Sequence, residues 1–209
     1  MASIRLGDRY SVIKLTYFPT TFWDPTSLTY LSQQTASDIF SQKKLNNCNT
    51  PEDRMEPRIR FKENAPDLYR SLLMLEKSIN DSGIDRTISN LVKIRASQIN
   101  GCAWCLDMHT KDALAEGESI LRISLIAAWW ECPQFNEKEK AALEWTEVIT
   151  LISEKKPDDE VYARLRMHFG EKEITYLTGA IVAINSWNRL NIAFKTIPGT
   201  YVAPGRGSK

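Results

Sequence analysis

Apolar residues recur every three or four positions through most of the chain, which is the spacing of helices that bury one face. In the stretch that begins at Pro66, for example, one stripe holds Leu68, Leu72, Leu75 and Ile79. Glycines interrupt the pattern where such helices are expected to end. The pattern predicts an all-α fold, with helices at about Pro66–Asn80, Asp85–Ile99, Cys102–Glu116, Ser119–Trp130, Glu137–Ser153, Asp158–Phe169 and Glu171–Phe194.

The first 54 residues differ from this pattern, because they are rich in Ser and Thr and show no clean helical period. Tyr10–Phe18 is rich in β-branched and aromatic residues, which favours a short strand. The Asn-rich residues 46–51 are typical of a linker. We therefore expect an irregular N-terminal extension over residues 1–54, a helical domain over residues 55–197 and a loose C-terminal tail over residues 198–209.

Composition and charge exclude several classes of protein. Hydrophobic residues make up 43% of the 209 positions, enough for a buried core. The formal net charge of +1 gives no sign of the basic face that nucleic-acid binding requires. No apolar run reaches the roughly 20 residues that span a bilayer. The N-terminus has neither the unbroken apolar segment nor the cleavage site of a secretory signal, so a cytoplasmic location is expected.

The candidate chemistry lies in the spacing Cys-x2-Cys-x3-His, formed by Cys102, Cys105 and His109. A helix turns by roughly 100° per residue, so all three side chains fall on one narrow face. Cys105 and His109 are four residues apart and can touch. In a reducing compartment, such a close cysteine pair indicates catalysis, redox chemistry or metal binding rather than a structural disulfide.

The position of the pair favours redox chemistry. If Gly101 ends one helix, both cysteines lie in the first turn of the next, where unpaired amides and the helix dipole favour an anion. Such sites lower the pKa of a thiol and so increase the reactive thiolate. A histidine nearby can take or relay a proton. These parts suit a dithiol peroxidase or a thiol–disulfide oxidoreductase that needs no cofactor and no metal.

Other interpretations of the pair stay open. Two cysteines can simply be small buried apolar residues. A structural zinc site needs a fourth ligand, which Cys48, Cys132 or His168 would have to supply from a distance. Covalent haem attachment needs a histidine at position 106, which is Leu106. A thioredoxin-type site needs a βαβ context, and the flanking segments are helical instead.

The remaining candidate residues are expected to play structural roles. His168 precedes Gly170, where a cation complements the end of a helix. Four tryptophans are expected to be core or interface anchors: Trp129, Trp130, Trp145 and Trp187. One of the adjacent pair is expected to face another subunit. Three asparagines of the last helix share one side and either make hydrogen bonds near the site or face water: Asn185, Asn188 and Asn191.

The residues from Leu91 to His109 read LVKIRASQINGCAWCLDMH. This segment closely resembles the carboxymuconolactone decarboxylase-like superfamily, in its alkylhydroperoxidase D-like branch. Residues 137–150 and 184–190 are similar to the same branch, and the resemblance covers about Met55 to Ile197. It implies an all-α alkylhydroperoxidase D-like domain that assembles into homo-oligomers, either trimers or hexamers.

The resemblance also implies a peroxidase activity in which Cys105 attacks the peroxide, Cys102 resolves the oxidised sulfur and His109 relays protons. Alkylhydroperoxidase D carries a glutamate twelve residues before the first cysteine, and this chain has Asn90 there. An amide cannot take up a proton at neutral pH. Either the site is slower, or another carboxylate serves, for which Asp107, Glu144 and Glu147 are candidates.

The sequence thus predicts a thiol-dependent peroxidase of the peroxiredoxin type, with a hydroperoxide as substrate and a dithiol or redox protein as reductant. Neither nucleic acid nor a membrane is expected as a partner. One alternative is a decarboxylase-like lyase or isomerase that acts on a small cyclic acid. The other is a non-enzymatic, redox-sensing oligomer.

Overall fold

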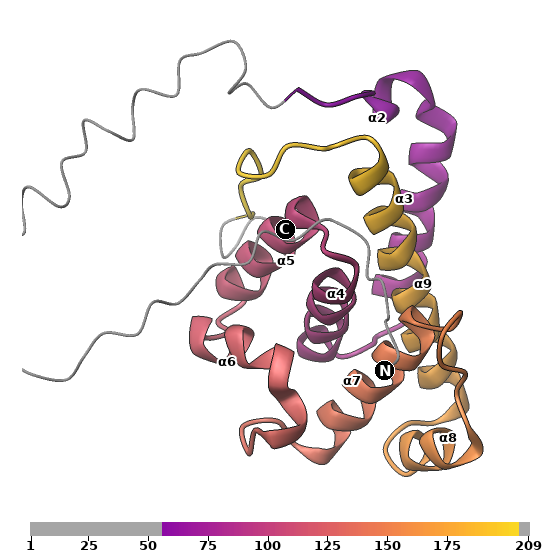
Figure 1. Cartoon of the computed structure of the whole chain (residues 1–209). Coiled ribbons are helices and arrows are strands. Elements are labelled where there is room, and N and C mark those ends of the chain that lie inside the picture. The colour runs from indigo at the N-terminus through magenta and orange to yellow at the C-terminus, as the bar shows by residue number, and fades with distance from the viewer. Residues whose placement is uncertain (1–55, 205–209) are drawn as a thin grey trace, which may run out of the picture. The chain divides into compact units, whose positions relative to one another are not determined.

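The computed structural model describes residues 56–204, and every regular element in that range is a helix (Figure 1). The elements are α2 Phe61–Asn64, α3 Pro66–Asp81, α4 Arg86–Asn100, α5 Ala103–Ala115, α6 Ile120–Leu125, the 3-10 helix η4 Ile126–Glu131, α7 Glu137–Thr150, α8 Asp159–Arg166 and α9 Glu171–Ala193. The predicted all-α fold is confirmed. The expected Tyr10–Phe18 strand, the linker and the N-terminal extension lie outside the described residues.

Helix α4 lies at the centre of the domain, between α5, α7 and α9 (Figure 1). It contributes to each of the buried apolar clusters of the described residues: Ile88 and Val92 to one, Leu91 and Ile94 to another, Ala96 to the last. The sequence predicted one apolar face for this helix, whereas the structure buries it on several sides. The polar side chains of Ser89, Lys93 and Ser97 are consequently buried as well.

The predicted helix Ser119–Trp130 is wrong in one respect, because it divides into α6 and η4. The backbone of Ala128 leaves helical geometry at φ −129° and ψ 33°. Beyond this break, the Trp129 indole donates to Glu147 over 2.7 Å, while Trp130 contacts the Trp129 ring edge to face and stays 52% exposed. The four-residue helix α2 was not predicted, since it is too short to show a period.

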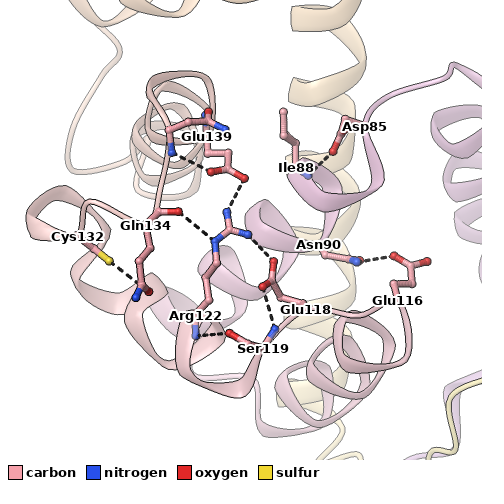
Figure 2. A network of polar contacts seen from close by, with 11 residues as sticks. Asp85, Ile88, Asn90, Glu116, Glu118, Ser119, Arg122, Cys132, Gln134 and Glu139 are labelled. Atoms are coloured by element: carbon pink, nitrogen blue, oxygen red, sulfur yellow. Dashed lines mark hydrogen bonds and ion pairs between the residues drawn. The ribbon is translucent and has the colours of Figure 1, made fainter.

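Arg122 joins α6 to the start of α7 (Figure 2). Its guanidinium forms ion pairs with Glu118 and Glu139 and donates to the carbonyl of Gln134. Glu139 also closes a capping box with Asn136 at the start of α7. A capping box satisfies two otherwise unpaired amides, so the same carboxylate starts α7 and anchors α6.

The residues after α9 pack on α5, so the expectation of a loose tail is wrong for residues 199–204. The Gly199 amide donates to Asp107 over 3.0 Å, and Lys111 donates to the Tyr201 carbonyl over 2.9 Å. The Tyr201 hydroxyl donates to Asp112 over 2.6 Å. Short-range sequence patterns could not reveal these bonds, because their partners lie some 90 positions apart.

No helix among residues 56–204 is both long and apolar enough to cross a membrane.

We expect Ile181→Ala to lower the free energy of unfolding by about 3 kcal/mol, because removing a buried side chain leaves a cavity. Ile181 is fully buried on α9, in the cluster that also holds Val92. Its neighbour Val182 is 50% exposed, so Val182→Ala is the matched control and should change stability by less than about 0.5 kcal/mol. Urea denaturation followed by circular dichroism measures both, and equal losses would contradict the packing described here.

Candidate active site

The turn between α4 and α5 sets the position of both cysteines. Gly101 ends α4 with φ +70°, a left-handed conformation that glycine adopts without strain. Cys102 follows as the N-cap of α5, in an extended conformation, and Cys105 lies in the first turn. Gly101 therefore ends one helix, as the sequence analysis assumed, and α5 begins one residue later than predicted.

Cys102 and Cys105 are joined by a disulfide, with their Cα atoms 5.4 Å apart. The Cys102 sulfur also accepts a hydrogen bond from the Cys105 amide over 3.3 Å. Both residues are buried, with relative exposures of 1% and 0%, and they pack with Ala96 and Ile184. The structure is thus that of the oxidised dithiol, held at the positive end of a helix.

Asparagines of α9 bind the region around the disulfide. Asn191 donates to the Cys105 sulfur over 3.5 Å. Asn100 donates to the side-chain oxygens of both Asn185 and Asn188, and Asn188 donates to Ser97 over 3.1 Å. Of the two alternatives for these asparagines, hydrogen bonding near the site is the one observed. The bonds fix α9 against the end of α4, directly before the turn that carries Cys102.

His109 lies one turn beyond Cys105 on α5 and is 5% exposed. Burial, reinforced by the positive charge of Lys93, lowers the pKa of His109 from 6.5 to about 3. The imidazole is therefore neutral at physiological pH, with one nitrogen free to accept a proton. Its Nδ1 lies 4.0 Å from Oδ2 of Asp112.

A cavity of about 1230 Å³ opens beside these residues. Cys105, Met108 and His109 contribute to its wall, which places the cavity beside Cys105 and the imidazole. Its other walls include the aromatic side chains of Phe61, Tyr69, Trp104, Trp187 and Tyr201. Trp187, expected to be a core or interface anchor, packs against the cluster that holds both cysteines, and it also lines this cavity and donates to Glu76 over 3.2 Å.

Two ion pairs add charge to the cavity wall. Lys93 and Glu76 form a largely buried pair at 2.7 Å, which joins α4 to α3. Glu116 pairs with Arg86 at 2.8 Å and accepts a hydrogen bond from Asn90 over 2.7 Å (Figure 2). All five side chains line the cavity, together with Asp112. The wall therefore offers apolar, cationic and anionic contacts.

The three carboxylates that the sequence offered in place of a glutamate at position 90 lie away from the cavity wall. Glu144 pairs with Arg164, Glu147 with Arg95, and Asp107 with Lys111. The carboxylate that the sequence analysis missed is Asp112, which follows His109 at a spacing of three and shares its helix face. That spacing could have identified it.

The remaining cysteine and histidine candidates lie apart from the disulfide. Cys132 packs with Leu91 and Phe135 in a different cluster, and Cys48 lies outside the described residues. His168 follows α8, as expected for a residue at a helix end. Within residues 56–204 no three His, Cys, Asp or Glu side chains are arranged to hold a metal ion.

Comparison with known proteins yields one family and several relatives. The model of the carboxymuconolactone decarboxylase family matches residues 66–148. The chain is 47% identical to the uncharacterized protein YdfG of Bacillus subtilis over 139 residues, which is 66% of this chain and 95% of YdfG. It is 30% identical to the uncharacterized protein YnjA of Escherichia coli over 112 residues, 54% of this chain and 61% of YnjA.

Solved structures show the same fold. A protein of unknown function from Agrobacterium tumefaciens, whose name suggests an antioxidant defence protein AhpD, is 37% identical with a TM-score of 0.68. The match covers 70% of this chain and 100% of that protein. The debrominase Bmp8 bound to 2,3,4-tribromopyrrole is similar in fold alone, at 18% identity and a TM-score of 0.60 over 66% of this chain and 74% of Bmp8.

Because the unfolded chain binds a proton at His109 below pH 6.5 and the folded protein does so only near pH 3, acid should destabilise the fold through this residue. Lowering the pH from 7 to 5 should cost about 2 kcal/mol at His109 alone. Urea denaturation of the oxidised protein at both pH values measures the loss. His109→Gln should remove the contribution of His109 to the loss of stability between pH 7 and pH 5. An unchanged pH dependence of stability in this variant would contradict a neutral, buried imidazole.

Asn191→Leu should raise the pKa of the Cys105 thiol by about one unit, because a hydrogen bond to a charged sulfur is lost. The measurement is the pH dependence of iodoacetamide labelling of Cys105, in protein that also carries Cys102→Ser. Ile192→Ala, at an exposed neighbouring position, is the control and should leave the pKa unchanged. Equal pKa values in all three proteins would show that Asn191 does not stabilise the thiolate.

Proposed function

The chain belongs to the carboxymuconolactone decarboxylase family, and we propose that within it the chain acts as a thiol-dependent peroxidase. The observation that carries the proposal is the pairing of Cys105 with Cys102 beside a cavity whose wall holds Cys105 and a neutral His109. This arrangement supplies a nucleophile, a resolving thiol and a proton acceptor within two turns of one helix.

The proposed reaction begins with the reduced pair. His109 takes the proton of the Cys105 thiol, and the thiolate attacks the outer oxygen of a hydroperoxide. The O–O bond breaks, Cys105 becomes a sulfenic acid, and His109 returns the proton to the departing oxygen, which leaves as alcohol or water. The Cys102 thiol then displaces hydroxide from the sulfenic acid and forms the disulfide, with release of water.

An external dithiol completes the cycle. It donates two electrons and two protons to the Cys102–Cys105 disulfide through a mixed disulfide, and it leaves as an oxidised disulfide. The overall reaction converts one hydroperoxide and one dithiol into an alcohol, a water molecule and a disulfide. Because both sulfurs are buried, the cavity is the route by which a small dithiol, or a dithiol carried by a redox protein, would approach.

The relatives support this proposal in part. The name of the Agrobacterium tumefaciens protein suggests antioxidant defence, and all of that protein matches 70% of this chain at 37% identity. A peroxidase-related protein of Ralstonia eutropha shares the fold at 17% identity and a TM-score of 0.59. Neither comparison by itself establishes a peroxidase activity for this chain, so the proposal depends on the cysteine pair.

We further propose that the protein is cytoplasmic, where reductants keep the pair active, and that it forms a trimer or hexamer. Exposed apolar side chains on neighbouring elements support an interface: Leu114, Ile120, Leu121 and Trp130. The exposed Trp130 agrees with the expectation that one of the adjacent tryptophans faces another subunit.

The decisive experiment is peroxide consumption by the reduced protein with an external dithiol, using hydrogen peroxide and cumene hydroperoxide. Cys105→Ser should abolish turnover, and Cys102→Ser should stop it after the sulfenic acid forms. Cys132→Ser is the matched control, since Cys132 lies in another cluster, and it should keep wild-type activity. Turnover that survives Cys105→Ser would refute the mechanism.

Intact-mass measurement after peroxide treatment separates the alternatives. Loss of two hydrogens with sustained turnover supports the peroxidase. Disulfide formation without turnover supports a non-enzymatic redox sensor, and no change in mass favours a lyase or isomerase that acts on a small cyclic acid.

A further inference from the structure

The peroxidase mechanism leaves open what supports His109. In alkylhydroperoxidase D a glutamate occupies the position of Asn90, and the structure shows how this chain uses its amide instead. Asn90 donates to Glu116 over 2.7 Å (Figure 2). Glu116 is also bound by Arg86 at 2.8 Å. Asn90 can accept no proton, and Glu116 is bound by two donors at the exposed rim, with its side chain 39% exposed.

Asp112 supplies a carboxylate close to His109, which Asn90 cannot do. It lies on the next turn of α5 after His109, lines the same cavity and directs Oδ2 to within 4.0 Å of the His109 Nδ1. That separation exceeds a direct hydrogen bond, but a bridging water or a small rotation of the carboxylate closes it. Among the described residues, Asp112 is the carboxylate that stands in ion-pair range of His109.

Tyr201 fixes the other oxygen of this carboxylate. Its hydroxyl donates to Asp112 Oδ1 over 2.6 Å, which leaves Oδ2 to face the imidazole. The segment that carries Tyr201 is itself bound to α5, because Lys111 donates to the Tyr201 carbonyl and the Gly199 amide donates to Asp107. The Tyr201 ring also contacts Trp104 edge to face, at 6.4 Å between centroids.

From this geometry we propose that Asp112, oriented by Tyr201, is the positioning residue that holds His109 for proton transfer in place of the family glutamate. The inference rests on the proposed function. A carboxylate behind Nδ1 keeps the proton on that nitrogen, so that Nε2 is the nitrogen that accepts the Cys105 proton. The imidazolium that then forms lies against a negative charge, and the proton passes on to the departing oxygen.

The surroundings of Asp112 set the pH range in which its carboxylate takes up a proton. Burial and the nearby Glu116 raise the pKa of Asp112 above 3.8, while the Tyr201 hydrogen bond and Lys93 act against this shift. Lys93 is paired with Glu76 of α3, and Lys111 is paired with Asp107. Removing the Tyr201 hydroxyl should therefore raise the pKa of Asp112 further, because a bond to its charged form is lost.

The test compares Asp112→Asn, Tyr201→Phe and the rescue variant Asp112→Glu with the wild-type protein. The first readout is the rate at which the reduced protein loses two hydrogens with cumene hydroperoxide, in single turnover from pH 5 to pH 9. Asp112→Asn should slow this step by about 10- to 100-fold, as losses of a partner behind a functional histidine typically do. Tyr201→Phe should shift the acid limb of the profile to higher pH, and Asp112→Glu should recover part of the rate.

The matched control is Asp107→Asn, and Glu116→Gln tests the other carboxylate close to Asp112. Asp107→Asn removes the charge that pairs with Lys111 and weakens the bond to Gly199 in the same segment, without touching the His109 partner, so its profile should match the wild type. If Asp107→Asn lowers the single-turnover rate as much as Asp112→Asn does, Asp112 and Tyr201 only hold residues 199–204 against α5. An effect confined to Glu116→Gln would assign the role to Glu116 instead, and wild-type rates in Asp112→Asn would overturn the proposal.

A second readout needs no peroxide and so separates this inference from the proposed function. In protein that carries Cys102→Ser, Asp112→Asn should raise the pKa of the Cys105 thiol, because the imidazole that accepts the thiol proton loses the carboxylate that stabilises the resulting cation. Iodoacetamide labelling of Cys105 against pH measures it. If the wild-type protein fails to consume hydroperoxide, the peroxidase proposal fails, and this pKa alone decides the role of Asp112. An unchanged pKa would then refute it.

Discussion

The burial of α4 on several sides is the constraint on which the rest of the domain depends. A helix packed against α5, α7 and α9 cannot leave all of its polar side chains in water, so the buried ones must find partners inside the protein. Lys93 pairs with Glu76 and Ser97 accepts from Asn188. These bonds fix α3 and α9 around the end of α4, and the turn at Gly101 then sets where α5 begins.

The chemistry of the site follows from the same burial. Cys105 lies in the first turn of α5, where a thiolate is favoured, and its sulfur receives a hydrogen bond from Asn191. His109 is kept neutral because both burial and the charge of Lys93 disfavour the imidazolium. A neutral imidazole can take a proton from a thiol, but its cation then needs a nearby negative charge, which makes the position of Asp112 important.

The C-terminal segment, residues 199–204, supplies the hydroxyl group that binds Asp112. By binding α5 at Asp107 and Lys111, it brings the Tyr201 hydroxyl to Asp112 and forms one wall of the cavity. The cavity thus combines elements from both ends of the described chain, from α2 to Pro204. Access to the buried sulfurs and support for the histidine are therefore parts of one packing arrangement.

The sequence by itself determined the helices and the compact trio of Cys102, Cys105 and His109, because helical period, glycine stops and spacing within one helix are local properties. It also showed that Asn90 cannot act as a proton acceptor. It could not show that α6 and η4 separate, that residues 199–204 pack on α5, or that Glu144 and Glu147 lie away from the cavity. Those outcomes depend on contacts between residues far apart in the chain, such as Tyr201 with Asp112, which only the tertiary structure brings together.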